Sequence, residues 1–267
     1  MNLKSRIGKF RAKKSLGQNF LISEEHINKI ASTLNKEKSI IVEIGAGLGF
    51  LTEKLLAQGS LVYALDYDLE ALSSISNHEN LKKIHADILN FNLNFLEKEF
   101  FIAGNLPFNI GTKILLKIIG GFENINWEVF RVEEMILMFQ LEVAQRLTAK
   151  VGSKAHNSLS LLMEAKTQCE FLFEVNSNCF YPAPKVKGGV IRIKKNINPS
   201  FAELDLTKRK LLERIIRQAF STKRKTLRNS LKSLLKDSDF EELNILPNLR
   251  AEDLSLEQFI SIAKFIN

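Results

Sequence analysis

The sequence predicts an α/β fold, in which a mostly parallel seven-stranded sheet is followed by a small all-helical domain. Three features of the 267-residue chain support this prediction. The apolar run Ile40–Ile44 leads into alternating glycines and then into leucines at helical spacing, which is typical of a strand, a tight turn and a helix. Apolar runs then alternate with helical patterns up to residue 194, and beyond Pro199 only helical spacing remains.

The glycine-rich turn predicts a ligand site. Gly45, Gly47 and Gly49 have the spacing G-x-G-x-G, whereas loops that bind a dinucleotide carry G-x-G-x-x-G, so we discount NAD. Glu43, two residues before the first glycine, favours a positively charged ligand over one with phosphates. S-adenosylmethionine, a sulfonium without phosphate, fits both features. The alternative is a glycine-rich turn that binds no ligand.

The predicted strands bring polar residues to one edge of the sheet. The strands are expected at residues 40–43, 60–66, 82–85, 99–103, 135–139, 169–175 and 189–194. Asp66, Asp87 and Asn105 fall at or just after strand ends, and in open α/β sheets ligands bind at this carboxyl edge. No helical pattern separates the last two strands, so we expect the last strand to be antiparallel, because a parallel pair needs a longer crossover.

Asn198-Pro199 marks the predicted boundary between two domains, residues 1–197 and residues 198–267. The net charge of +8 is concentrated in two segments. Residues 1–22 hold six basic side chains and no acid, and residues 207–236 hold eleven basic side chains and one acid. Basic charge gathered on an otherwise acidic chain predicts a polyanionic partner, and nucleic acid is the favoured one. The alternative is a merely solvated basic face.

Composition argues against several other classes of protein. No run of about 18 apolar residues and no signal-peptide core is present, so we expect no membrane span, no secretion and a cytoplasmic location. Cys169 and Cys179 are the only cysteines, and no histidines stand near them at ligand spacing. We therefore expect neither a metal site nor a disulfide framework.

The motif Asn105-Leu106-Pro107-Phe108 suits methylation of an exocyclic amine. The N6 lone pair of adenine is delocalised into the ring and is a weak nucleophile. Hydrogen bonds from N6–H to the Asn105 side-chain oxygen and the Leu106 carbonyl would favour a pyramidal nitrogen, with its lone pair aimed at the methyl group. Pro107 fixes the turn, and Phe108 can stack on the base. An ordinary strand-to-helix turn is the alternative for this motif by itself.

Six segments carry a resemblance to a known family. They are residues 16–21 (LGQNFL), 42–49 (VEIGAGLG), 105–110 (NLPFNI), 158–160 (SLS), 180–186 (FYPAPKV) and 219–229 (AFSTKRKTLRN). Over essentially its full length the chain resembles the KsgA-type small-subunit ribosomal RNA adenine dimethyltransferases. The last two segments distinguish it from the large-subunit RNA methyltransferases of macrolide resistance, which share the earlier motifs.

The resemblance implies a Rossmann-like class I methyltransferase domain and S-adenosylmethionine as cofactor. It implies dimethylation of two adjacent adenosines in a hairpin near the 3′ end of 16S rRNA, within an assembling small subunit and by a monomer. Cofactor contacts are implied for Asn19, Leu21, Gly45, Gly47, Asp87 and Asn105. Phe108 and Phe180 would flank the target base. RNA contacts are expected at Lys223, Arg224, Lys225 and Arg228.

The chain departs from the family pattern at two positions. The aromatic residue after Asn-Leu-Pro is usually tyrosine and here is Phe108. The second strand usually ends with a glutamate that binds the ribose hydroxyls, and we place Ala64 at that position. Asp66 would lie about 6–7 Å further along the strand and be at most a partial substitute, so we expect weakened cofactor binding. A catalytically silent RNA-binding assembly factor and an adenine methyltransferase of large-subunit RNA remain the alternatives.

Overall fold

The computed structural model describes residues 10–34, 39–124, 131–222 and 224–266. Contacts between residues divide the chain into two units. Unit 1 comprises the described residues of Met1–Ile118, Asn126–Ala144 and Glu170–Lys194, and unit 2 those of Ile119–Ile125, Gln145–Cys169 and Lys195–Asn267. Residues 145–169 thus group with the C-terminal helices, although residues 167–169 begin a strand of the sheet. The functional division at residues 197 and 198 stays a prediction.

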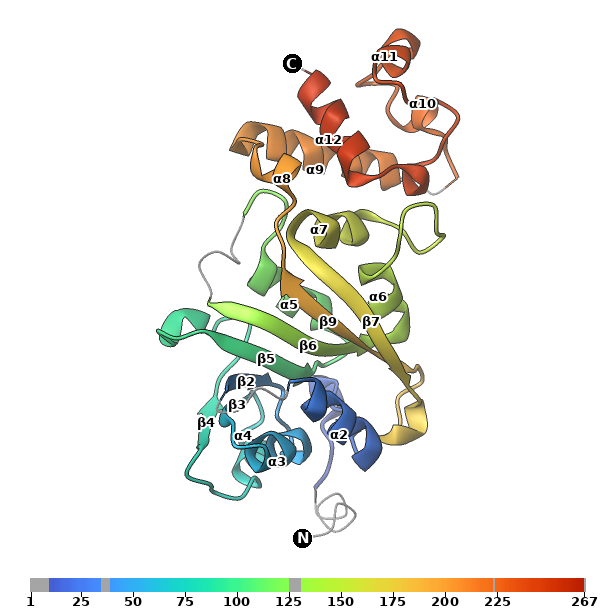
Figure 1. Ribbon diagram of the computed structural model, residues 1–267. Helices are drawn as coiled ribbons and strands as arrows, with labels where there is room; N and C mark the ends of the chain where they lie inside the picture. The colour runs from blue at the N-terminus through green and yellow to red at the C-terminus, as the bar shows by residue number, and fades with distance from the viewer. Residues whose placement is uncertain (1–9, 35–38, 125–130, 223, 267) are drawn as a thin grey trace. The chain divides into compact units, whose positions relative to one another are not determined.

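Unit 1 is built around a seven-stranded sheet with the strand order β4-β3-β2-β5-β6-β9-β7 (Figure 1). The strands are β2 (Ile40–Ile44), β3 (Leu61–Asp66), β4 (Leu81–His85), β5 (Phe100–Asn105), β6 (Val132–Gln140), β7 (Thr167–Val175) and β9 (Gly188–Lys195). The strands from β4 to β6 pair in parallel, whereas β9 pairs antiparallel with β6. The arrows of β7 and β9 run in opposite directions in Figure 1. The predicted fold class is confirmed, including the reversed last strand.

The helices of this part of the chain are α2 (Glu24–Thr33), α3 (Phe50–Ala57), α4 (Leu69–Ser73), α5 (Gly111–Ile119) and α6 (Leu141–Leu147). Three of them, α3, α4 and α5, connect successive parallel strands, whereas α2 precedes β2 and α6 follows β6. Helices α2 and α3 pack against each other (Figure 1). On α2 the side chains of Ile27, Ile30 and Ala31 are buried, as their spacing of three and four residues predicts. The interior strand β2 is buried on both faces, which explains why all of its residues except Glu43 are apolar.

A second, two-stranded sheet was not predicted. β1 (Phe20–Leu21) pairs antiparallel with β8 (Phe180–Tyr181), so that Phe20 lies opposite Tyr181 and Leu21 opposite Phe180. Strands of two residues are too short to show an alternating pattern in the sequence. The pairing joins the segment before α2 to the segment between β7 and β9.

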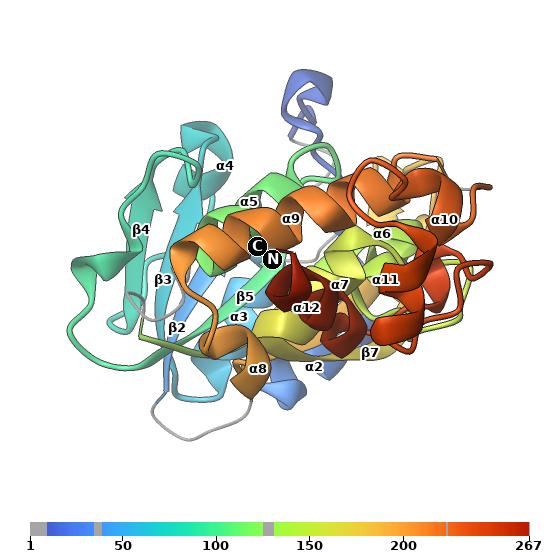
Figure 2. The ribbon, with the colours of Figure 1, turned by 90° about the horizontal axis from the view of Figure 1, so that it is seen from above.

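Unit 2 is helical. Its elements are α7 (Ser158–Lys166), α8 (Pro199–Ala202), α9 (Leu206–Phe220), α10 (Leu227–Ser230), α11 (Asp237–Glu242), η5 (Ala251–Asp253) and α12 (Leu256–Phe265). Helix α12 lies against α9 (Figure 2). Their facing apolar residues, such as Ile215 of α9 and Phe259 of α12, are fully buried. The basic side chains Lys210, Arg214 and Arg217 of α9 stay exposed.

Candidate cofactor and substrate site

A cavity of about 280 Å³ lies in unit 1, where strands β2 to β5 end. Four of its walls are the segments that follow these strands: the glycine turn, residues 65–67, residues 86–89 and residues 105–110. A fifth wall is formed by residues 15–20, from the N-terminal side of β1. The strand ends that the sequence analysis singled out therefore do meet around one space, as the topology rule for parallel sheets requires.

The glycine turn requires glycine at three positions. Gly45, Gly47 and Gly49 have φ angles of 75°, 53° and 81°, in the left-handed region that other residues rarely adopt. A Cβ atom on Gly47 would lie 2.8 Å from the ring of Phe20. The backbone N–H of Gly45 donates a hydrogen bond to the Leu65 carbonyl (2.8 Å), which fixes the turn to the end of β3.

Asp66 is the last residue of β3 and lines the cavity. One oxygen of its carboxylate accepts a hydrogen bond from the Gly47 N–H (2.7 Å) and the other accepts one from the Asp68 N–H (2.8 Å). Burial raises the pKa of Asp66, and these two hydrogen bonds oppose the shift. Each carboxylate oxygen keeps a second lone pair, so the group can also accept a hydrogen bond from a ligand hydroxyl.

The structure places Ala64 away from the cavity. Ala64 is fully buried and lies inside the sheet, opposite Glu43 of β2 and Lys83 of β4, and it does not line the cavity. Asp66, the last residue of β3, does line it. This geometry favours Asp66 over position 64 for a ribose contact, and the expectation that Asp66 is only a partial substitute for a glutamate stays a prediction.

Asp87 follows β4 and lines the cavity. Its carboxylate accepts hydrogen bonds from the Leu89 N–H (2.9 Å) and from the Asn90 side-chain amide (2.8 Å). These contacts hold the carboxylate in place at the end of the strand. Its predicted contact with the amine of the cofactor's adenine stays a prediction.

Asn105 ends β5, and its amide is fixed by a hydrogen bond. The Nδ2 group donates to the backbone carbonyl of Asn19 (2.7 Å), so the side-chain oxygen remains to accept a hydrogen bond from a substrate. Leu106, Pro107 and Phe108 line the same cavity. The Pro107 carbonyl accepts hydrogen bonds from the first turn of α5, which fixes the direction in which the motif leaves the strand. The four residues of the motif thus lie together at one wall.

Besides Ala64, three residues expected near the ligand do not line the cavity. Leu21 is buried in β1, and Phe180 is buried in β8, with 3% of its surface exposed. Phe180 instead packs edge-on against Phe108, with ring centroids 6.1 Å apart, and so supports the ring that does line the cavity.

Glu43 is buried too and accepts a hydrogen bond from the Thr52 hydroxyl (2.5 Å). Burial raises the pKa of Glu43 to about 8, so the expected negative charge facing the ligand is absent at neutral pH.

Replacing Glu43 with glutamine should alter the pH dependence of stability. The folded protein holds a proton on Glu43 up to about pH 8, whereas the unfolded chain releases it near the ordinary glutamate pKa of 4.5. The free energy of unfolding of the wild type should therefore fall between these values, and each unit of pKa difference corresponds to about 1.4 kcal/mol. Glutamine does not titrate and can still accept the Thr52 hydrogen bond. Urea unfolding at pH 5, 6.5 and 8 should show Glu43→Gln gaining stability over the wild type as pH rises, and parallel profiles would contradict this.

Several cavity residues were not predicted as site residues, although some of them lie in the segments that carry the family resemblance. They are Ser15, Leu16, Gly17, Gln18, Phe20, Ile44, Leu65, Tyr67, Ala86, Ile88, Leu89, Asn109, Ile110 and Ile114. Six of them directly flank Asn19, Asp66 or Asp87, so a search of the positions adjoining these three residues would have found those six. Among the described residues no three His, Cys, Asp or Glu side chains are grouped so as to hold a metal ion.

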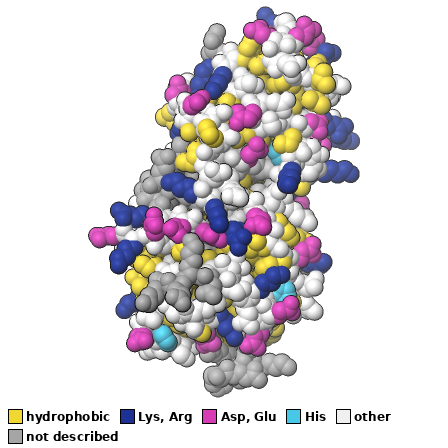
Figure 3. All heavy atoms as spheres, viewed as in Figure 1, with side chains coloured by type: hydrophobic (Ala, Val, Ile, Leu, Met, Phe, Trp, Pro, Cys, Tyr) yellow, Lys and Arg dark blue, Asp and Glu magenta, His cyan; other side chains and the backbone are white. Residues whose placement is uncertain are grey.

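The residues predicted to contact RNA lie in unit 2, except that Lys223 falls outside the described residues. Arg224, Lys225 and Arg228 are exposed, and Arg228 also pairs with Asp237 (3.0 Å). In the face shown in Figure 3, Lys and Arg side chains stand among acidic and apolar ones. In the part of the chain that the structure describes, no helix has the length and apolarity needed to cross a membrane.

Comparison with known proteins identifies the family. The family model described as "Ribosomal RNA adenine dimethylase" matches residues 9–267. A ribosomal RNA small subunit methyltransferase A of Francisella tularensis is 36% identical, over 97% of this chain and 99% of its own length. Among solved structures, a dimethyladenosine transferase from Plasmodium falciparum has a TM-score of 0.73 at 22% identity, covering 91% of this chain and 95% of its own. The 23S rRNA methyltransferase ErmE has a TM-score of 0.68 at 20% identity, covering 93% of this chain and 99% of its own. The two structures share the fold, and on the family match and the Francisella relative the chain belongs to the ribosomal RNA adenine dimethylase family.

Proposed function

We propose that this protein dimethylates N6 of two adjacent adenosines near the 3′ end of 16S rRNA, during maturation of the small ribosomal subunit. Its membership of the family confirms the predicted enzyme class, an S-adenosylmethionine-dependent ribosomal RNA adenine dimethyltransferase. The observation that carries the choice of adenine N6 is the fixed amide of Asn105 at the cavity wall, beside Leu106 and Phe108. The small-subunit target is favoured by the 36% identity to a small-subunit methyltransferase.

The residues around the cavity fit S-adenosylmethionine. A cavity of about 280 Å³ is within reach of the two fixed carboxylates Asp66 and Asp87 and of the glycine turn. Asp66 would accept hydrogen bonds from the ribose hydroxyls and Asp87 from the adenine amine. The glycines let the backbone approach the methionine part closely. When bound, the cofactor supplies an electrophilic methyl group on its sulfonium.

The target adenine would be held by the motif at the end of β5. The Asn105 side-chain oxygen and the Leu106 carbonyl would accept the two N6–H hydrogens, which favours a pyramidal nitrogen with an available lone pair. Phe108 would stack on the base, supported from behind by Phe180. Positioning of the two reactants accounts for most of the catalysis, and the side chains need only hold the amine until its proton leaves to solvent.

The test is methyl transfer to ribosomal particles that lack these methyl groups. Purified protein is incubated with labelled S-adenosylmethionine and with unmethylated small subunits, naked 16S rRNA or large subunits. We expect dimethylation of both adenosines in the small subunits, read by mass spectrometry of nuclease fragments. Label in the large subunit would favour the large-subunit alternative. Small-subunit binding without transfer would favour a silent assembly factor.

The basic run of unit 2 is proposed as the surface that contacts the RNA, with the protein acting as a monomer in the cytoplasm. Reversing Arg224, Lys225 and Arg228 to glutamate should weaken subunit binding. The slope of log K against log salt should flatten by about 0.7–0.9 for each phosphate group that the protein no longer neutralises. Lys82→Glu, an exposed change in β4, is the control for charge alone. An unchanged slope in the triple variant would make the run a solvated face.

A further inference from the structure

The N-terminal strap, defined here as residues 13–20, forms one wall of the cavity but has little structure of its own. It contains one three-residue turn of 3₁₀ helix, Lys14–Leu16, and the first residue of the two-residue strand β1. Segments this short are not stable by themselves. The strap therefore stays over the cavity only through its contacts with the rest of unit 1.

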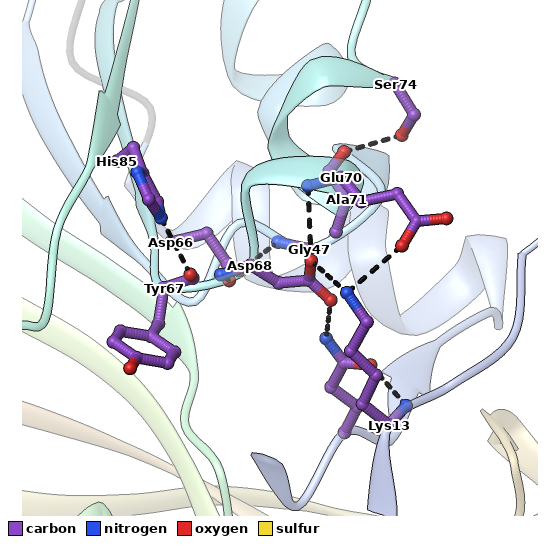
Figure 4. A network of polar contacts seen from close by, with 10 residues as sticks. Lys13, Gly47, Asp66, Tyr67, Asp68, Glu70, Ala71, Ser74 and His85 are labelled. Carbon is purple, nitrogen blue, oxygen red and sulfur yellow. Dashed lines mark hydrogen bonds and ion pairs between the residues drawn. The ribbon is translucent and has the colours of Figure 1, made fainter.

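Gln18 makes the central contact of the strap. Its side-chain oxygen accepts a hydrogen bond from the Lys13 N–H (2.7 Å), and its Nε2 donates one to Asp68 Oδ2 (2.7 Å). Lys13 Nζ adds ion pairs to Asp68 (2.7 Å) and Glu70 (3.1 Å), as Figure 4 shows. The Asp68 side chain is 2% exposed, whereas those of Lys13 and Glu70 are 41% and 66% exposed. Because exposed ion pairs contribute little, the Lys13–Glu70 pair adds little, and the strap is held mainly by the partly buried bonds of Gln18 and Lys13 to Asp68.

The strap is tied to both halves of the site through adjacent residues. Gln18 binds Asp68, whose own N–H donates to the cavity carboxylate of Asp66 (2.8 Å). Asn19, the next residue, accepts the hydrogen bond that orients the Asn105 amide (2.7 Å). The same short segment thus adjoins the proposed ribose contact at one side and the proposed base contact at the other.

We propose that Gln18 is a positioning residue, which latches the strap closed over the cofactor cavity by its hydrogen bond to Asp68. This inference rests on the proposed function, since it takes the cavity to be the S-adenosylmethionine site. A cofactor that touches the strap binds only molecules whose strap is closed over the cavity. Its apparent affinity therefore falls in proportion to the fraction of molecules in that closed state. In a variant without the latch, saturating S-adenosylmethionine still holds the strap closed. The closed strap keeps the Asn105 amide oriented, so the turnover number at saturating cofactor returns to that of the wild type.

Gln18→Leu tests the latch, because leucine fills similar space and makes neither hydrogen bond. We expect the Kd values of S-adenosylmethionine and S-adenosylhomocysteine to rise by the same factor, on the order of tenfold, which is the usual effect of losing a hydrogen bond to a charged group. The kcat at saturating cofactor should stay within about twofold of the wild type. Lys54→Met, which breaks the exposed ion pair with Glu24 (3.0 Å), is the matched control and should change neither value.

A swapped pair separates the latch from a general loss of packing. Gln18→Glu alone keeps the acceptor for the Lys13 N–H but sets two carboxylates against each other, so it should weaken cofactor binding at least as much as Gln18→Leu. Adding Asp68→Asn supplies an amide N–H at position 68, which can donate a hydrogen bond to the new carboxylate at position 18. The oxygen of the same amide can still accept a hydrogen bond from the Glu70 N–H at the start of α4. The double variant should recover most of the affinity.

Three results would overturn the latch. The first is a Gln18→Leu variant whose Kd for S-adenosylmethionine, kcat and melting temperature are all unchanged. The second is a Gln18→Leu variant with a lower kcat and melting temperature but an unchanged Kd, which would show that Gln18 only supports folding. The third is a double variant that does not recover the affinity for the cofactor. Failure of the wild type to bind S-adenosylmethionine by calorimetry would instead reject the proposed function, so the two failures are distinguishable.

Discussion

Asn105→Ala is expected to abolish methyl transfer while leaving the affinity for S-adenosylmethionine within about tenfold of the wild type. The variant removes the oxygen that would accept an N6–H hydrogen, and losing one oriented group of this kind costs about 10²–10³ in kcat. It also removes the hydrogen bond to the Asn19 carbonyl, which explains why a small loss of affinity is allowed. Single-turnover transfer to unmethylated small subunits and calorimetry with the cofactor measure the two effects separately. Near-normal turnover would refute the assignment.

Phe108 supplies the control for that experiment, because in the proposed complex it adjoins the same base without accepting a hydrogen bond. Phe108→Tyr should be tolerated, since the ring and its edge-on contact with Phe180 are kept. Phe108→Ala should impair transfer, because stacking on a base contributes about 1–3 kcal/mol. Loss of activity in Phe108→Tyr would indicate that the wall is too tight for the added hydroxyl, and that the ring has another task than stacking.

The features that were predictable from the sequence are those with a local signal. The buried strands show as apolar runs, and the polar residues at their ends are brought together by the topology of a parallel sheet, so Asp66, Asp87 and Asn105 could be placed at one site in advance. The reversed last strand followed from the missing helix before it. In each of these cases neighbouring residues in the sequence determine the outcome.

What could not be predicted depends on contacts between distant segments or on the direction of one side chain. The β1–β8 pairing buries Leu21 and Phe180, and two residues give no periodic signal. Glu43 alternates with Val42 and Ile44 along a strand that is buried on both faces, so its carboxylate enters the core and not the ligand space. The grouping of residues 145–169 with the C-terminal helices likewise reflects packing of α7 against α9 and α12.

The assignment of Ala64 came from matching the family's glutamate to position 64, although the strand itself was expected to reach residue 66. The ladder does continue to Asp66, which pairs with His85. Ala64 is held between neighbouring strands on both sides. Its burial there accounts for a small apolar residue at this position.

Asp66→Ala is therefore expected to cause the largest loss of cofactor affinity in this chain. The carboxylate is the proposed acceptor for the ribose hydroxyls, and hydrogen bonds to a charged group contribute about 1.5–3 kcal/mol, or roughly 10- to 150-fold in Kd. The change also frees the Gly47 and Asp68 N–H groups that the carboxylate now holds, which should loosen the glycine turn. Calorimetry with S-adenosylmethionine gives the Kd, and Asp66→Glu, which keeps the charge, should retain most of the affinity.

Ala64→Glu supplies the opposing test. The substitution places a charged side chain in a fully buried position of the sheet, beside Glu43, so it should destabilise the protein by about 3 kcal/mol or more and should not tighten cofactor binding. Thermal unfolding measures the loss of stability, and calorimetry of the folded fraction measures the affinity for the cofactor. If Ala64→Glu were stable and bound S-adenosylmethionine more tightly, while Asp66→Ala bound it normally, ribose recognition would belong to position 64. The hydrogen bonds of Asp66 to Gly47 and Asp68 would then serve only to shape the turn.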